Sequence, residues 1–249
     1  MYLVAIAELR GTVDTALASL ASTLGTTPYE LRLVLNAGMP AVVLATVDEA
    51  KARSTASALS REGHATVTLD RRTVVASADM TELVRFQLTP TSVVADERTG
   101  EELPFAEIGA LIRAMHRGTT TTTEEVKERK FRPVMAIASG GMVMTKKTTR
   151  EVTRREEHRD QVLYVFRRSG APPWILRERG ALYTGLGKDI GPTAFGNFQT
   201  TIQKLRAAAP GAAFDERLMN GRPIRGVAEG SEACDLLAYV IAAHAMRAG

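Results

Sequence analysis

The chain has 249 residues, of which 45% are apolar, and this is enough material for one large domain or two ordinary ones. Its 32 basic and 28 acidic residues leave a net charge of +4, an excess too small to indicate a nucleic-acid partner by itself. A single cysteine, Cys234, excludes an intramolecular disulfide and favours a reducing compartment. The histidines show no metal-ligand spacing, so we expect no bound metal. We also expect no cofactor and, from the single cysteine, a cytoplasmic location.

The N-terminus predicts a strand and not an export signal. The first residues lack the basic region of a secretory signal peptide, and the apolar run ends at Glu8, which is too early for the apolar region of such a signal. Uncharged apolar stretches elsewhere fall well short of the roughly 20 residues that cross a bilayer. The sequence therefore predicts no transmembrane segment.

The first seventy residues alternate between strand and helix patterns. Apolar residues at 3–9 indicate a strand, and those at 13–24 share one helical face. Thr27 to Glu30 is a capping box that begins a short second helix. A buried strand follows Pro40, and a further helix and the alternating strand 65–69 complete the order β-α-α-β-α-β.

This order comes with characteristic glycines and prolines, in the segments Leu24-Gly25, Gly38-Met39-Pro40-Ala41-Val42-Val43 and Arg61-Glu62-Gly63-His64-Ala65. Together they resemble, over residues 1–70, the C-terminal domain of the ribosomal stalk protein, whose fold the Clp protease adaptor shares. The resemblance implies a compact fold used for docking to other proteins. It does not imply factor binding, because the second helix carries Glu30 and a lone Arg32 where the stalk family uses lysines.

Residues 83–208 combine short strands with one amphipathic helix. Alternation at 84–88 indicates a strand, and 92–105 indicates a hairpin with a polar turn. Apolar segments at 162–166 and 174–176 flank a turn rich in Gly and Pro, which predicts a second hairpin. Thr193 is expected to cap a helix, and its predicted buried face consists of Phe195, Phe198, Ile202 and Leu205.

Residues 105–117 fit two interpretations. Five apolar side chains share one helical face, with Pro104 before them and Gly118 after them, and this periodicity predicts a helix. They are Phe105, Ile108, Leu111, Ile112 and Met115. The strands and the helix of 83–208 also resemble a pleckstrin-homology-like β-barrel, whose bacterial members often carry a phrase similar to Leu103–Ile108 on their third strand; that resemblance implies a strand at 108–115.

The predicted fold class is therefore α+β. A small βααβαβ domain at 1–70 precedes a pleckstrin-homology-like domain at 83–208, into which a hairpin at about 124–160 is inserted. Residues 221–249 are expected to form a loop and a terminal helix, with Ser231 as its cap and Met246 near its end.

No motif indicates catalysis, so the sequence predicts no catalytic residues, although an enzyme without short motifs stays an open alternative. Gly141–Thr148 matches a phosphate-binding loop except at Lys146, whose side chain obstructs the close approach that the missing glycine would permit. Gly185–Gly191 precedes a helix that could hold an anion. A plain loop is the simpler interpretation, because no βαβ unit surrounds these glycines.

The inserted hairpin carries the main functional hypothesis. An uncharged segment, 133–145, lies between charged flanks, and Gly140-Gly141 is a favoured two-residue turn. Either this segment supplies core strands or it exposes an apolar tip that a partner or a second copy of the chain buries. The candidate interaction residues are Val134, Met135, Ile137, Met142, Val143 and Met144.

The flanks of this segment hold ten basic and seven acidic residues between Glu124 and Asp160, which supply +3 of the total charge. The candidate anion-binding residues are Lys127, Arg129, Lys130, Arg132, Lys146, Lys147, Arg150, Arg154 and Arg155. The leading hypothesis is a non-enzymatic intracellular protein-interaction module that forms a homo-oligomer through the apolar tip of this hairpin. The alternative is binding to an anionic lipid surface or to nucleic acid.

Overall fold

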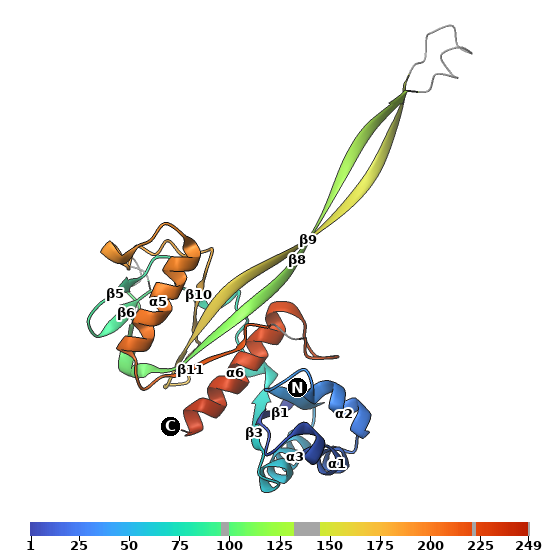
Figure 1. Ribbon diagram of the computed structural model, residues 1–249, viewed down its shortest axis with the longest axis vertical. Coiled ribbons are helices and arrows are strands. Elements are labelled where there is room, and N and C mark those ends of the chain that lie inside the picture. The colour runs from blue at the N-terminus through green and yellow to red at the C-terminus, as the bar shows by residue number, and fades with distance from the viewer. Residues whose placement is uncertain (96–99, 132–144, 221–222, 249) are drawn as a thin grey trace. The chain divides into compact units, whose positions relative to one another are not determined.

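The computed structural model describes residues 1–95, 100–131, 145–220 and 223–248, and for 118–131 and 145–158 it describes the path of the backbone. It is a mixed α+β protein, as the sequence predicts (Figure 1). The chain divides into two compact units, one made of Met1–His116 with Arg159–Gly249 and the other of Arg117–His158. The described strands form three open sheets, so no closed barrel is found among them.

The first sheet has the strand order β2-β1-β3, with both neighbours antiparallel to β1. Its elements are β1 (Tyr2–Glu8), α1 (Val13–Leu24), α2 (Pro28–Leu35), β2 (Ala41–Thr46), α3 (Glu49–Arg61) and β3 (Ala65–Asp70). The predicted βααβαβ order is confirmed. The capping box of α2 is also confirmed, because Thr27 Oγ1 accepts from the Glu30 amide and the Glu30 carboxylate accepts from the Thr27 amide.

A bulge interrupts the pairing of β2 with β1. Val4 lies opposite Leu44 and the next residue, Ala5, lies opposite Val42. Val43 is therefore the extra residue of β2, and β2 bends at this point. Because β2 is the last strand in the order, no strand of the described residues lies beside its second edge.

Strand β1 is buried on both faces, which explains its unbroken apolar sequence. Val4 and Ile6 pack against α1, α2 and α3 in one cluster. Leu3, Ala5 and Ala7 belong to a different cluster that includes the C-terminal helix α6 (Gly230–Ala248).

The second sheet has the order β11-β8-β9-β10-β4. Its strands are β4 (Thr81–Glu82), β8 (Ile108–Phe131), β9 (Thr145–Arg167), β10 (Trp174–Arg177) and β11 (Ala213–Leu218). The predicted hairpin of 162–176 is confirmed, since Trp174 pairs with Val165 in the antiparallel β9–β10 ladder.

A third, small sheet and helix α5 cover one face of this second sheet. The remaining elements are β5 (Gln87–Leu88), β6 (Ser92–Val94), β7 (Glu102–Pro104), α5 (Ala194–Ala208) and three short 3-10 turns, Arg71–Thr73, Phe105–Glu107 and Gly187–Asp189. Strands β6 and β7 form the predicted antiparallel hairpin. Their apolar side chains share one cluster with Trp174 and with Phe198 of α5.

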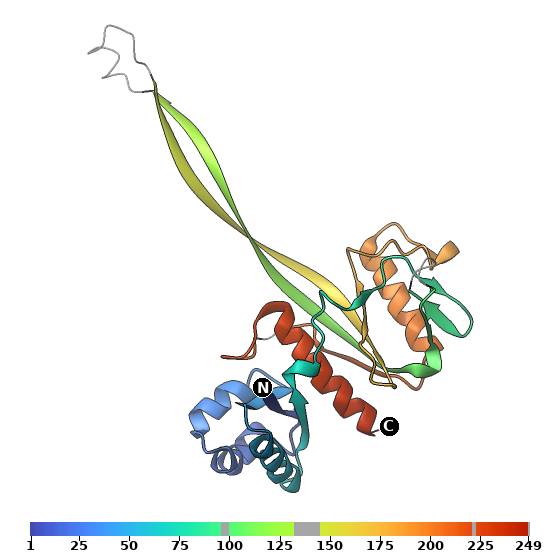
Figure 2. The ribbon, with the colours of Figure 1, turned by 180° about the vertical axis from the view of Figure 1, so that it is seen from behind.

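Helix α6 lies between the first and second sheets (Figures 1 and 2). Ala110 and Ile112 of β8 and Leu3 and Ala5 of β1 belong to the same buried cluster as its apolar side chains. A helix buried on opposite sides is expected to be apolar around most of its circumference. Its buried apolar residues are Ala233, Cys234, Leu236, Leu237, Ala238, Val240, Ile241 and Ala242.

The helix that periodicity predicts at 105–117 is wrong, because residues 108 onward form β8. The sheet is covered on both faces, so the adjacent residues Leu111 and Ile112 are both buried but in different clusters. Burial of consecutive residues produces the same spacing as a wide helical face. The competing interpretation, a strand at 108–115, is confirmed.

Three smaller expectations also need correction. The strand expected at 84–88 is limited to Gln87–Leu88. Phe195, predicted on the buried face of α5, is 51% exposed, whereas Phe198 and Ile202 are buried. Ser231 lies inside α6, which begins at Gly230. The domain boundaries at 70, 83 and 208 stay a prediction, although α6 packs directly against β1 and β3.

In the unit Arg117–His158, β8 and β9 are hydrogen-bonded neighbours whose backbones coil about each other (Figure 1). The predicted turn at Gly140-Gly141 and most of the segment 133–145 lie outside the described residues. The start of the possible phosphate loop lies there too, and its end, Thr145–Thr148, belongs to β9. A phosphate loop is followed by a helix, so this position does not fit one.

Gly185 has a packing role. It forms an isolated bridge with Gln87, and a Cβ added to it would lie 2.2 Å from the carbonyl oxygen of Phe86. The glycine therefore permits two backbone segments to approach closely. The following 3-10 turn, Gly187–Asp189, is separate from α5 and too short to offer an anion site.

We predict that Gly185→Ala lowers the free energy of unfolding by about 1–3 kcal/mol, because the backbone must move to admit the methyl group. Urea denaturation measures the change. Gly211→Ala is the matched control, since its added Cβ would make an ordinary contact of 3.4 Å with the Arg168 side chain. Equal stability of the two variants would contradict the packing role.

Candidate functional site

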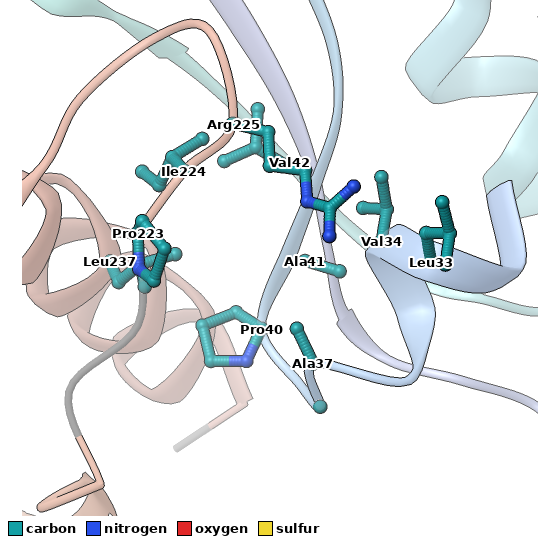
Figure 3. A pocket seen from close by; sticks show the side chains of 11 residues that line it. Leu33, Val34, Ala37, Pro40, Ala41, Val42, Pro223, Ile224, Arg225 and Leu237 are labelled. Atoms are coloured by element: carbon teal, nitrogen blue, oxygen red, sulfur yellow. The ribbon is translucent and has the colours of Figure 1, made fainter. Parts of the chain in front are cut away.

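A cavity of about 240 Å³ opens at the outer edge of β2 in the larger unit. Figure 3 shows its 11 lining residues, which come from α2, from β2 and the turn before it, from 223–225 and from α6. The free edge of the first sheet therefore lies between a helix that covers one face and a helix that covers the other.

The floor of the cavity is buried and apolar. It consists of Pro40, Ala41, Ile224 and Leu237, all with little solvent exposure. Ala41 belongs to the cluster around α1–α3, and Leu237 belongs to the cluster around α6. The core of the protein therefore fixes the floor from both faces of the sheet.

The rim of the cavity is exposed. Leu33 of α2 is 37% exposed, and Ala37, Pro223 and Arg225 also face solvent. The turn from α2 into β2 passes through Gly38, whose φ of 98° is readily accessible only to glycine. This tight turn places α2 directly beside the first residues of β2.

Arg225 is the only charged residue among the described lining residues. A turn holds it, in which the Val227 amide donates to the Ile224 carbonyl oxygen at 3.0 Å and Gly226 has a φ of 69°. A glycine with positive φ at the third position is typical of a type II turn. The guanidinium extends over the cavity toward Val34 and Leu33 (Figure 3).

The outer edge of β2 is available for pairing. Within the described chain, the backbone of 41–45 has hydrogen bonds to β1, and none to another segment is recorded. An edge strand presents unpaired N–H and C=O groups that can pair with an added strand. The site thus combines an apolar cavity, one cation and a free strand edge.

A second candidate is a buried chain of polar side chains, His116, Tyr164 and Asp235. Tyr164 Oη donates to Asp235 Oδ1 at 2.6 Å and lies 2.6 Å from His116 Nε2. Asp235 Oδ2 also accepts from the Ser77 amide at 2.9 Å. These contacts join β8, β9 and α6 with the segment that follows β3.

Burial controls the protonation of this chain. Desolvation lowers the pKa of His116 to about 4 and raises the pKa of Asp235. The pKa of Tyr164 is raised well above its usual value, mainly by burial and then by Asp235. His116 is therefore neutral at neutral pH, and its 3.9 Å approach to Asp235 is not an ion pair under those conditions.

The single hydroxyl proton of Tyr164 fixes which group donates in each hydrogen bond of this network. When it is donated to an ionised Asp235, His116 must be the donor to Tyr164 Oη through Nε2. His116 is 6% exposed and Asp235 is 2% exposed. Side chains this deeply buried are poorly accessible to a substrate, and their hydrogen bonds to one another tie β8, β9 and α6 together in the core.

The structure places only part of the residue set that the sequence predicts. Lys127, Arg129 and Lys130 lie on β8, and their counterparts Lys146, Lys147, Arg150, Arg154 and Arg155 lie on β9. Arg132 and all six apolar interaction residues, Val134, Met135, Ile137, Met142, Val143 and Met144, lie outside the described residues.

The cavity itself was missed by sequence reasoning, because its residues come from 33–42 and 223–237 and no local pattern links them. Among the described residues no group of three or more His, Cys, Asp or Glu could hold a metal ion. In the same part of the chain, no helix is both long and apolar enough to span a membrane.

We predict that His116 makes the protein less stable in acid. As the pH falls from 6.5 toward 4, an unfolded histidine takes up a proton that buried His116 does not, so the free energy of unfolding decreases. Between about pH 7 and pH 5 wild type should lose about 2 kcal/mol more than His116→Gln, which keeps an amide donor but does not titrate. Urea denaturation at each pH measures this, and identical pH profiles would contradict it.

Comparison of the chain with protein-family models, with curated protein sequences and with solved structures finds no match. The resemblances of 1–70 to the stalk and adaptor fold and of 83–208 to a pleckstrin-homology-like domain therefore stay predictions.

Proposed function

We propose that the protein is a non-enzymatic interaction module that binds an apolar side chain of a partner protein in the cavity between α2, β2 and α6. The observation that carries this proposal is the cavity itself, which has an apolar floor, an exposed rim and, beside it, a strand edge that no described strand pairs with. We infer an intracellular location from the single cysteine, which is buried.

The size of the cavity favours a side chain over a cofactor. Pockets for drug-sized ligands occupy roughly 300–1,000 Å³, and this cavity, at about 240 Å³, is smaller. Further apolar surface lies along α2, where Tyr29 is 72% exposed and Leu33, one helical turn later, is 37% exposed. A peptide backbone lying across this rim would cover both side chains.

The fold resemblances supply weaker support. The βααβαβ order of 1–70 suits the stalk and adaptor fold, whose members dock to other proteins, and this is an argument by analogy. The pleckstrin-homology-like interpretation of 83–208 has less support, since the described strands form open sheets. Self-association through the apolar tip at 134–144 remains a separate proposal that does not involve the cavity.

We predict that Ala37→Trp blocks binding, because an indole at this exposed rim position can occupy the cavity. Peptides are first selected from a random display library on the immobilised full-length chain, and their dissociation constants are then measured by fluorescence anisotropy. Affinity should fall at least about tenfold in the variant, with stability unchanged.

Ala18→Trp is the matched control, since Ala18 is an exposed alanine of α1 that does not line the cavity. Peptides that bind both variants equally well, or a library that yields no binder, would overturn the proposed function.

An alternative function is binding to an anionic surface through the basic residues of β8 and β9. Eight of the nine candidates lie on these two adjacent strands. This alternative predicts retention on phosphatidylserine vesicles that is lost as salt is raised. No retention at low salt would remove it.

A further inference from the structure

We infer that the cavity recognises the free C-terminus of an extended peptide whose last residue is apolar, which pairs as an added strand along β2. This inference rests on the proposed function and names the ligand class for the same site.

The charge of the cavity indicates an anionic ligand. The described lining residues include Arg225 and no acidic side chain. Within the described chain the Arg225 guanidinium has no recorded hydrogen bond or ion pair. A guanidinium in this situation matches a carboxylate, which it can bind through two parallel hydrogen bonds.

Geometry then selects a C-terminal residue. Arg225 lines the same small cavity as Ile224 and Leu237, so the anionic and the apolar groups of the ligand must be only a few bonds apart. A C-terminal Val, Leu or Ile meets this condition, because its side chain and its carboxylate share one Cα. An internal acidic residue does not, since its side chain is itself the anion and a different residue must fill the cavity.

The strand edge accounts for the rest of the peptide. Residues 41 and 42 of β2 lie at the cavity, and no strand in the described part of the chain pairs with their outer edge. A strand added there alternates its side chains between the two faces of the sheet. The face covered by α2 and the face covered by α6 would then receive successive side chains, with the terminal residue in the cavity.

The test uses N-terminally labelled short peptides that end in Val, Leu, Ile, Met or Phe, each prepared as a free acid and as a C-terminal amide. We expect saturable anisotropy changes with free acids and at least about tenfold weaker binding of the amides. N-methylation of alternate backbone amides should abolish binding, whereas N-methylation of the intervening amides should not, because only alternate residues bond to β2.

Arg225→Gln is expected to weaken the free acids at least about tenfold and to leave the amides unchanged. Arg225→Lys, which keeps the charge without the two-bond geometry, should have an intermediate effect. Arg85→Gln is the matched control, because Arg85 is exposed and does not line the cavity.

Equal binding of acids and amides, insensitivity to Arg225→Gln or failure of every peptide of the set would overturn the C-terminal inference. If Ala37→Trp still weakens the binding of the library peptides in that case, the proposed function stands. If Ala37→Trp has no effect on them, the proposed function fails independently.

Discussion

The burial of α6 between two sheets is the constraint on which the larger unit depends. Each sheet already has one covered face, by α1–α3 in one case and by α5 with the small sheet in the other. The two remaining faces are both apolar, and a single helix at the end of the chain covers both of them. Without α6 the inward residues of β1, β8 and β9 would be exposed, and each buried Leu or Ile side chain contributes about 1.5–3 kcal/mol.

This arrangement also explains how the cavity is held in shape. Leu237 forms part of its floor from the α6 side, while Ala41 forms part of it from the sheet. A floor made of core residues changes little in shape, because packed interiors do not deform continuously. The rim consists of exposed residues on α2 and in 223–225, which can vary without loss of the fold. If the cavity binds the proposed ligand, substitutions at the rim can therefore change affinity with little effect on stability.

How much the sequence predicts depends on how local each signal is. The elements of 1–70 were predictable because caps such as Thr27–Glu30 and turns such as Gly38 mark their ends directly. At 105–117 periodicity alone predicts a helix, because consecutive residues buried on the two faces of a strand give the same spacing as a wide helical face. Arg225 carries no local signal, because its neighbourhood is created by contacts with residues almost two hundred positions earlier. The His116–Tyr164–Asp235 chain was unpredictable for the same reason.

The bulge at Val43 has a consequence for the solubility of the protein. A flat, unpaired edge strand invites indiscriminate pairing with other chains and so promotes aggregation. The extra residue bends β2 after two residues, so a long strand cannot follow the whole edge in one register. A strand added beside Ala41 and Val42 would have to change register at the bulge to continue beside Leu44. The single extra residue thus divides the outer edge of β2 into two short lengths, 41–42 and 44–46, and this makes long regular pairing with other chains less favourable.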